Sequence, residues 1–413
     1  MSPNQTEDCG LKDSCLPAGR EDCGLKDCGL KRLIIACDSF KDSLGAFAVC
    51  EAVKRGVQLA DPGIHCTLLP MADGGEGTAE ILAHYTGGQM VEMVSVGPLF
   101  RPVKASYGIS KDGRTAFIDM AACSGLQLLK RGERNPMLTS TFGTGLMIKN
   151  AVERGAEKIV LGIGGSATND AGMGMATALG FSFFDKNGKL LKGRGKDLRA
   201  VAHFTESGFL SKGLLSEKNK NVEVEVLCDV NNVLYGAGGA SLVYAPQKGA
   251  DGKMVTDLDL GLRSFAEMVA GQTGRHFENL PGAGAAGGTG FGAKVFLQAN
   301  LTSGIDKVLE AAGFERLLEG ADLVITGEGK IDEQTASGKL IAGICRKAKK
   351  KKVPVAALCG ALEASPEVVK KIGLAAAFSI VNRPMDLEEA LKNTAVLLEE
   401  TAAHLVGLKL STF

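Results

Sequence analysis

The sequence contains no tryptophan, and only 5% of its 413 residues are aromatic. It also has no excess of either charge, because Lys+Arg and Asp+Glu each number 47. A chain without surplus positive charge has no general attraction to nucleic acid or to an anionic membrane surface. Its longest apolar runs are strand-sized and interrupted by glycine, which excludes a transmembrane helix. We therefore expect a protein that binds neither nucleic acid nor a membrane.

Several catalytic signatures are also missing. The five histidines are far apart and show no metal-ligand spacing, which argues against a histidine metal site. There is no GxSxG, the signature of a serine hydrolase, and no GxxxxGK[ST] phosphate loop. The first strand is followed by CDSFKDS and not by GxGxxG, which argues against an oxidoreductase that uses a nicotinamide cofactor.

The eleven cysteines fall into two groups. Seven are scattered through apolar segments, as reduced core cysteines are. The other four lie in the first thirty residues, where DCGLK occurs three times without a CxxC pair or the apolar stretch of a signal peptide. We predict that residues 1–30 are a disordered, duplicated extension or a misassigned start. The remainder is predicted to be a reduced, cytoplasmic enzyme.

What the chain has in plenty is glycine, 55 residues, placed mainly in loops that follow apolar runs. Near both ends of the chain, strand-like runs alternate with segments of helical periodicity, which predicts α/β architecture. We expect one three-layer parallel-sheet domain made of residues 31–95 and 296–413. A mixed α/β domain, residues 96–295, is predicted to be inserted into it, with a ligand cleft between the two.

Four predicted strand ends carry carboxylates beside small or cationic residues, and in a parallel sheet such ends face the ligand crevice. Carboxylates for a magnesium ion, a cation for the transferred group and loops rich in N–H groups together suit phosphoryl transfer. Purely structural interpretations remain open, because Asp38 and Asp73 could cap helices and Asp119 could be a buried, paired carboxylate. Lys41 could face the crevice from the first helical turn or be a solvated surface lysine. The residues at the four ends are Asp38, Ser39 and Lys41; Asp73 and Glu76; Asp229 and Asn231; and Glu328, Lys330, Asp332, Ser337 and Lys339.

A fifth polar turn, LGIGGSATNDAG, starts at residue 161 and follows another predicted strand. Its N–H groups and hydroxyls could cradle a phosphate or another anion. Its glycines could equally serve only tight strand–helix packing. The residues concerned are Gly164, Gly165, Ser166, Thr168, Asn169 and Asp170.

Seven segments in this order resemble the bacterial-type glycerate kinase family: CDSFKDSL, PMADGGEGT, GTGLMIKNAVERG, GIGGSATNDAGMGMATALG, LCDVNNVLYG, APQKGA and ADLVITGEGKIDEQTASGK. The resemblance runs from about residue 32 to the C-terminus. It implies a Rossmann- or flavodoxin-like domain with a second domain inserted, and an active site between them. The family usually reads APDSFKGS at the first segment, so Cys37 and Asp42 are departures.

The activity that this resemblance implies is ATP-dependent phosphorylation of glycerate, with 2-phosphoglycerate the favoured product and Mg²⁺ as cofactor. We expect Lys41, Asp73 and Asp229 to be catalytic, and Asp38, Asp73 and Asp229 to hold the metal. The partners would be small molecules only, and the protein a monomer or homodimer. The alternative is a non-catalytic sensor of a sugar acid or nucleotide. Expected substrate and phosphate contacts are Ser39, Gly74, Gly75, Gly164, Gly165, Ser166, Thr168, Asn169, Asp170, Asn231, Thr326, Gly327, Glu328, Gly329, Ser337 and Lys339.

Overall fold

The computed structural model describes residues 30–206, 222–333, 335 and 340–410. The predicted DCGLK extension therefore lies outside the described residues, apart from Leu30. In the described ranges, no helix has both the length and the apolar character needed to cross a membrane. The seven described cysteines are all free, five of them buried, which confirms the prediction of scattered reduced core cysteines.

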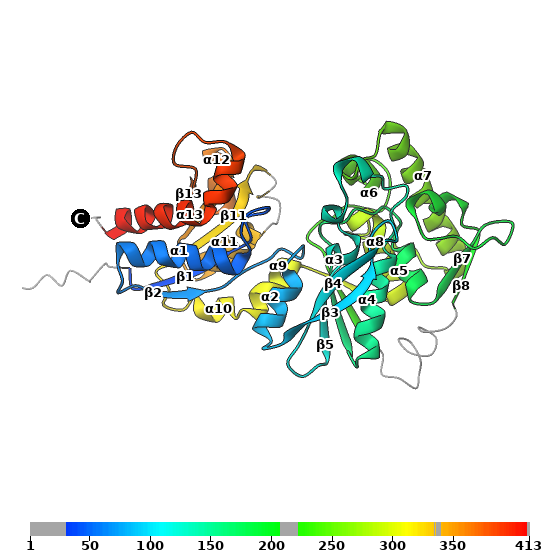
Figure 1. The fold of residues 1–413 in the computed structure, drawn as a ribbon, viewed down its shortest axis with the longest axis horizontal. Helices are drawn as coiled ribbons and strands as arrows, with labels where there is room; N and C mark the ends of the chain where they lie inside the picture. The colour runs from blue at the N-terminus through cyan, green and yellow to red at the C-terminus, as the bar shows by residue number, and fades with distance from the viewer. Residues whose placement is uncertain (1–29, 207–221, 334, 336–339, 411–413) are drawn as a thin grey trace, which may run out of the picture.

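The first sheet has five strands, all parallel, in the order β13-β12-β11-β1-β2. It joins strands from both ends of the chain, which confirms the predicted parallel sheet of discontinuous origin (Figure 1). Because helices cover both faces of this sheet, its strands read as continuous apolar runs. The strands are β1 (Arg32–Cys37), β2 (His65–Leu68), β11 (Leu323–Ile331), β12 (Val355–Leu362) and β13 (Ala376–Ser379).

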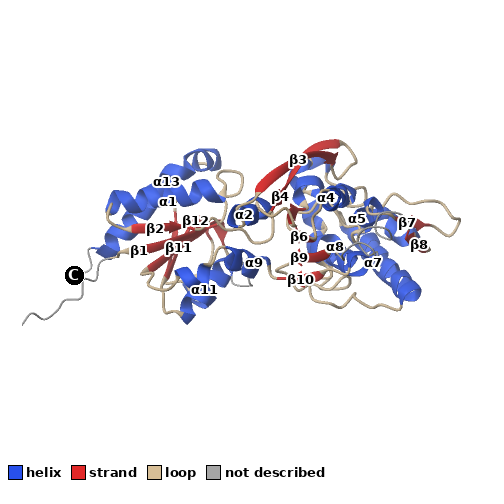
Figure 2. Cartoon of the chain, turned by 90° about the horizontal axis from the view of Figure 1, so that it is seen from below, coloured by secondary structure: helices blue, strands red, loops and turns tan. Residues whose placement is uncertain are grey.

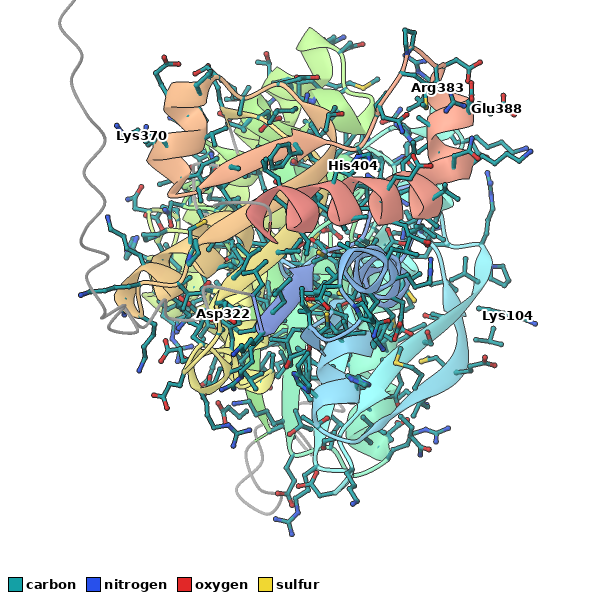
Figure 3. The ribbon with its side chains drawn as sticks, turned by 90° about the vertical axis from the view of Figure 1, so that its left-hand side faces the viewer. Lys104, Asp322, Lys370, Arg383, Glu388 and His404 are labelled. Atoms are coloured by element: carbon teal, nitrogen blue, oxygen red, sulfur yellow. The ribbon has the colours of Figure 1, made fainter. Side chains whose placement is uncertain are left out.

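Helices lie on both faces of this sheet, which gives the predicted three layers (Figure 2). Alternate residues of β1 point to opposite faces, so Leu33 and Ile35 join one core cluster and Ile34 another. The long C-terminal helix, which carries His404, runs beside α1 on the outer face (Figure 3). The helices are α1 (Ala46–Ala60) and α13 (Leu387–Leu410) on one face, with α9 (Gly304–Ala311), α10 (Phe314–Leu317), α11 (Leu340–Lys350) and α12 (Pro366–Ile372) completing this part of the chain.

The second sheet is mixed, with the order β10-β9-β6-β5-β4-β3. Its β3, β4 and β5 form an antiparallel meander, whereas β5, β6, β9 and β10 are parallel. The strands are β3 (Gln89–Val96), β4 (Pro102–Ile109), β5 (Thr115–Asp119), β6 (Lys158–Gly162), β9 (Glu223–Leu227) and β10 (Asn300–Thr302), with β7 (Phe181–Phe184) and β8 (His203–Glu206) forming a separate hairpin. The helices of this part are α2 (Thr78–Tyr85), α3 (Ala121–Ser124), α4 (Phe142–Glu153), α5 (Met173–Ala178), α6 (Ala240–Tyr244), α7 (Gly252–Thr273) and α8 (Ala285–Leu297).

The second sheet extends beyond the 96–295 segment expected from the sequence, since it begins with β3 at Gln89 and ends with β10 at Thr302. Helices α2 and α9 lie between the two sheets (Figure 1). One core cluster contains Ile34 of the first sheet together with Phe117 and Val160 of the second. The two halves of the molecule therefore share buried apolar surface around these two helices.

Candidate active site

Asp38 stands where β1 ends, and its N–H donates to the Gly327 carbonyl of β11 at 2.9 Å. The chain leaves β1 toward β2 on one side, whereas β11 pairs with β1 on the other. The β1–β11 boundary is thus a topological switch point, the place where open α/β sheets bind ligands. Glu328 is the next residue of β11, so two carboxylates, Asp38 and Glu328, occur at this boundary.

Neither Asp38 nor Asp73 caps a helix, so the capping interpretation is wrong. Helix α1 begins after Gly45 and α2 after Gly77, and neither N-terminus has a side-chain cap from its N-cap residue. Instead, one oxygen of Asp38 accepts the Ser39 N–H at 2.6 Å and the Ser39 hydroxyl at 3.2 Å. Asp73 accepts the Gly75 N–H at 3.2 Å. Both carboxylates belong to strand-end turns.

Lys41 lies in the turn between β1 and α1, not on the first helical turn as expected. Its side chain is exposed, and within the described ranges it has no hydrogen-bond or ion-pair partner. Its backbone passes close to Gly329, where an added Cβ would lie 3.5 Å from the Lys41 nitrogen. Asp42 has a φ of 64°, in the left-handed region that favours glycine. This backbone conformation accounts for the glycine usual in the family at that position.

The loop after β2 reaches across to the second sheet through two glycines. Gly74 has a φ of 90°, and a Cβ there would lie 3.3 Å from the Leu227 Cβ. A Cβ on Gly164 would lie 2.7 Å from the Gly75 Cα, and the Gly164 N–H donates to the Gly74 carbonyl at 3.3 Å. At Gly74 and Gly164 a side chain would separate the two loops, so both positions need glycine for close packing.

Asp229 follows β9 and meets the same loop. Its carboxylate accepts the Ser303 hydroxyl at 2.7 Å and the Ile305 N–H at 3.3 Å. A Cβ on Gly304 would lie 3.0 Å from the Asp229 Oδ2 and 3.0 Å from the Asp73 carbonyl oxygen. The Asp229 carboxylate and the Asp73 backbone, 156 positions apart in sequence, therefore both lie close to Gly304.

The carboxylates influence one another. Burial, together with the charges of Asp73 and Glu328, raises the pKa of Asp38 to about 8. Burial raises the pKa of Asp229 to about 6 against the opposing hydrogen bond from Ser303, and the charge of Asp73 adds to the increase. Asp73 is thus the carboxylate that links the β1 end of the first sheet to the β9 end of the second.

These carboxylates suit a cation that arrives with its own ligands. In the part of the chain that the structure describes, no three acidic, cysteine or histidine side chains form a group that could hold a metal ion, so the expected trio Asp38, Asp73 and Asp229 is not a preformed cage. Mg²⁺ is commonly bound through one or two carboxylates plus substrate phosphates and water. A cluster of mutually repelling carboxylates with raised pKa values fits that mode of binding.

Replacing Asp38 by Asn should stabilise the ligand-free protein at high pH. Because folding raises the pKa of Asp38, the folded state favours the neutral acid over the carboxylate. The stability that the neutral acid contributes is fully present below the unfolded pKa of 3.8 and is lost as pH rises toward about 8. We expect Asp38→Asn to exceed the wild type by about 2 kcal/mol at about pH 8, and the difference to vanish near pH 4. Urea unfolding across this pH range measures it.

Asp112→Asn is the matched control, because Asp112 is exposed and its pKa is lowered by hydrogen bonds from the Ser110 hydroxyl and the Arg114 N–H. This variant should gain no stability as pH rises. Parallel pH–stability curves for wild type and Asp38→Asn would show that Asp38 carries no buried, repelled charge.

The turn after β6 is held mainly by the protein itself. The N–H groups of Gly164, Ala167 and Ala171 already donate to backbone carbonyls. Asp170 is fully buried, and its oxygens accept the N–H and hydroxyl of Thr141 and the N–H groups of Gly172 and Gly174. Asp170 is therefore a structural carboxylate that fixes the start of α5, a correction to the expectation that it contacts a ligand. The sequence could not show this, because Thr141 is distant along the chain.

Other expected contact residues differ in accessibility. Asn231 is exposed beside Asp229, whereas Thr326 is fully buried and its hydroxyl donates to the Ala36 carbonyl at 2.6 Å. Thr326 thus ties β11 to β1 through its side chain, which corrects its expected role as a phosphate contact. Glu328 accepts the Thr335 hydroxyl at 3.0 Å. Ser337 and Lys339 lie outside the described residues.

Three polar residues outside the expected set shape this region. Asp119, the last residue of β5, is buried as one alternative held, and it caps α2 by accepting the N–H groups of Gly77 and Ala79 at 2.8 and 3.0 Å. Ser303 orients Asp229. Lys248 lies behind the turn after β6 and donates to Ser166 and Thr168. Its segment APQKGA belongs to the family resemblance, which was the one sequence signal that could have identified it.

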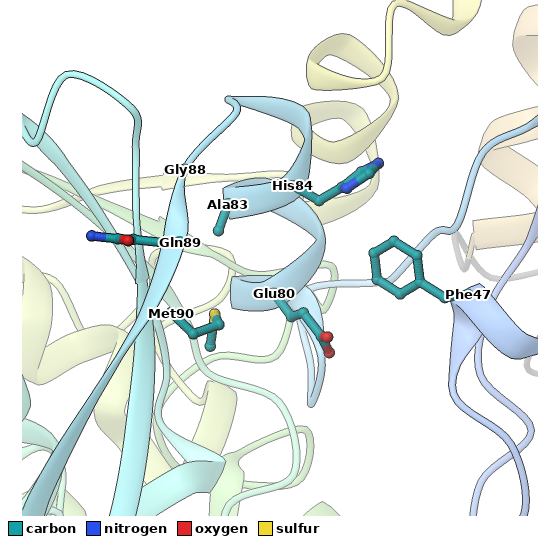
Figure 4. Close-up of a pocket in the computed structure, with 7 residues that line it drawn as sticks. All are labelled: Phe47, Glu80, Ala83, His84, Gly88, Gln89 and Met90. Carbon is teal, nitrogen blue, oxygen red and sulfur yellow. The ribbon is translucent and has the colours of Figure 1, made fainter.

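A separate cavity of about 360 Å³ lies between α1, α2 and the start of β3 (Figure 4). Its lining includes Phe47, Glu80, His84 and Met90. The Phe47 and His84 rings meet edge to face, with centroids 5.0 Å apart. None of the carboxylates at the strand ends lines this cavity, so it is distinct from the candidate site.

Comparisons with known proteins give one consistent result. The sequence profile described as the Glycerate kinase family matches residues 33–409. A protein named glycerate kinase from Bacillus subtilis (strain 168) is 46% identical over 376 residues, covering 91% of this chain and 97% of its own. Glycerate 2-kinase from Escherichia coli (strain K12) is 42% identical, covering 87% of this chain and 93% of its own. A crystal structure described as a putative glycerate kinase 2 from Salmonella typhimurium LT2 superposes with a TM-score of 0.77 at 40% identity, covering 92% of this chain and 98% of its own.

Proposed function

Because this chain belongs to the glycerate kinase family, we propose that it transfers the γ-phosphoryl group of ATP to glycerate. The product we propose is 2-phosphoglycerate, the position that the name of the Escherichia coli relative gives for that enzyme. The observation that carries the proposal is that the Asp73 backbone and the Asp229 carboxylate both lie close to Gly304, where the charge of Asp73 raises the pKa of Asp229. Phosphoryl transfer needs such a concentration of carboxylates, together with a cation for the transferred group.

Asp229 is the proposed general base. A pKa of about 6 leaves its carboxylate ionised at neutral pH yet basic enough to accept the proton of an attacking hydroxyl. The Ser303 hydroxyl, 2.7 Å away, and the Ile305 N–H fix the orientation of the carboxylate. The glycerate hydroxyl would lie against Asp229 during attack.

Asp73 and Asp38 are the proposed ligands of a magnesium ion bound with the nucleotide. When bound, the ion would neutralise charge on the phosphate oxygens. Asp73 is exposed, and its charge raises the pKa of both Asp38 and Asp229. A positive charge at this point would relieve the repulsion that raises these two values.

Lys41 is the proposed cation for the transferred phosphoryl group. Its side chain extends from the turn after β1, at the switch point that also presents Glu328. Gly329 lets the end of β11 pass close to the backbone of the turn that carries Lys41, since a Cβ there would lie 3.5 Å from the Lys41 nitrogen. Ser337 and Lys339 remain proposed phosphate contacts of the segment that follows.

A product assay tests the activity. Purified protein is incubated with ATP, MgCl₂ and D-glycerate, and phosphorus NMR identifies the new phosphate ester. We expect a signal coupled to one proton, as in the 2-phosphate, and its loss when EDTA removes the metal. A signal coupled to two protons would indicate the 3-phosphate instead. Binding of glycerate or ATP without any ester would favour the sensor alternative.

A further inference from the structure

Lys248 is a buried lysine without a paired carboxylate. Only 2% of Lys248 is exposed to solvent. Within the described ranges it takes part in no ion pair. Its ammonium donates to the Ser166 hydroxyl oxygen and to the Thr168 carbonyl, both at 2.7 Å. Burial lowers its pKa to about 7, against the opposing charge of Asp170. Burying an ammonium group is costly without a partner, so apolar packing does not explain a lysine at this position.

The contact with Lys248 sets the direction in which Ser166 can donate. Since the Ser166 oxygen accepts from the ammonium, its own hydrogen remains for another acceptor. Ser166 lies at the border of the interior, with an exposed fraction of 8%, next to exposed Gly165. Gly164, two positions earlier, packs on Gly75 beside Asp73. The hydroxyl therefore belongs to the part of the turn that adjoins the carboxylate loop.

Two further polar atoms of the same turn lack partners. The Thr168 hydroxyl and the Asn169 side-chain carbonyl are buried, and neither makes a hydrogen bond within the described part of the chain. The Asn169 amide nitrogen, in contrast, donates to Ser241 at 3.2 Å. Buried polar atoms are rarely left unpaired in native proteins unless a ligand or water completes them. The Thr168 hydroxyl therefore has a hydrogen to donate to a ligand, whereas the Asn169 oxygen can only accept, as from a hydroxyl group or water.

We propose that the turn from Gly164 to Asn169, with Lys248 behind it, binds the carboxylate group of the acceptor substrate. The inference rests on the proposed function. Ser166 would donate to the carboxylate, and Lys248 would act as a positioning residue that holds Ser166 and supplies positive charge. Glycerate bound in this way has its acid group on the second sheet and its hydroxyls toward Asp229. The first sheet is left for the nucleotide.

Steady-state kinetics of Ser166→Ala and Lys248→Met test the proposal. A hydrogen bond to a charged group contributes enough binding energy that its loss should raise the KM for D-glycerate about 10-fold to 100-fold. The KM for ATP should stay within about threefold of the wild type, and kcat should fall far less than the KM for glycerate rises. Titration calorimetry with D-glycerate alone should show the same weakening.

Matched controls are Ser182→Ala in β7 and Lys294→Met, whose ammonium donates to the Ala299 carbonyl at 3.0 Å. Both should keep the wild-type values of kcat and KM.

If the wild type phosphorylates glycerate and Ser166→Ala has an unchanged KM for glycerate, the inference is overturned and the proposed function stands. A raised KM for ATP alone also overturns it. A wild type that makes no phosphoglycerate contradicts the proposed function itself. If Lys248→Met does not fold, the result for Ser166→Ala alone tests the inference, because that change removes only one hydroxyl group.

Discussion

Replacing Asp229 by Asn should lower kcat about 10²-fold to 10⁴-fold, the usual contribution of a positioned general base. Asn keeps the size of the side chain and an oxygen that can accept the Ser303 hydroxyl, so the fold around Gly304 is retained. What it loses is the ability to take a proton. In the wild type, kcat/KM should rise with pH through about 6, since the carboxylate must be ionised to act.

The pH profile separates this role from a merely structural one. In Asp229→Asn the residual activity should no longer change with pH near 6, whereas a positioning defect would lower the curve and keep its shape. Asp259→Asn is the matched control, because Asp259 is a half-buried carboxylate of the same part of the chain that accepts the Gly236 N–H at 2.9 Å. An Asp229→Asn enzyme with near wild-type kcat would exclude Asp229 as the base.

The second large effect is expected at Lys41. Lys41→Met retains the length of the aliphatic chain and removes the charge that is proposed to stabilise the transferred phosphoryl group. Loss of one electrostatic contact of this kind costs about 10²-fold to 10³-fold in kcat. Lys41 is exposed and has no partner in the described part of the chain, so the free energy of unfolding should change little. Rapid-quench measurement of the first turnover checks the chemical step directly.

Lys370→Met is the control for charge and exposure. Lys370 is an exposed lysine near the end of α12 in the same half of the molecule (Figure 3). It should retain wild-type turnover, and Lys41→Arg should recover part of the activity because it restores the charge. Equal kcat values for Lys41→Met and Lys370→Met would remove Lys41 from the reaction.

The sequence predicted much of the fold because the signals were local. Apolar runs such as RLIIAC indicated strands buried on both faces, and helical periodicity after them indicated the layers. The second sheet also takes strands from outside the expected 96–295 segment. Strand β3 joins it through antiparallel pairing with β4, and β10 through parallel pairing with distant β9.

Within the candidate site, residue types could be anticipated and their tasks could not. Asp38, Asp119 and Asp170 all follow or end apolar runs, and nothing local distinguishes them. The structure separates them by their partners: Asp38 accepts from Ser39 and is influenced by the charge of Asp73, Asp119 caps α2, and Asp170 accepts from Thr141 and the start of α5. Lys248 was missed as a site residue for the same reason, since its partners lie about 80 positions away.

The sequence by itself determined the α/β class, the discontinuous parallel sheet and the strand ends that carry carboxylates, because each depends on periodicity and turn chemistry over a few residues. Only the tertiary structure decided that the Asp73 backbone and the Asp229 carboxylate lie together at Gly304, that Thr326 and Asp170 are internal, and that Lys248 donates to Ser166. Burial and long-range contact set the charge and accessibility of a side chain, and neither property is written in the neighbouring residues.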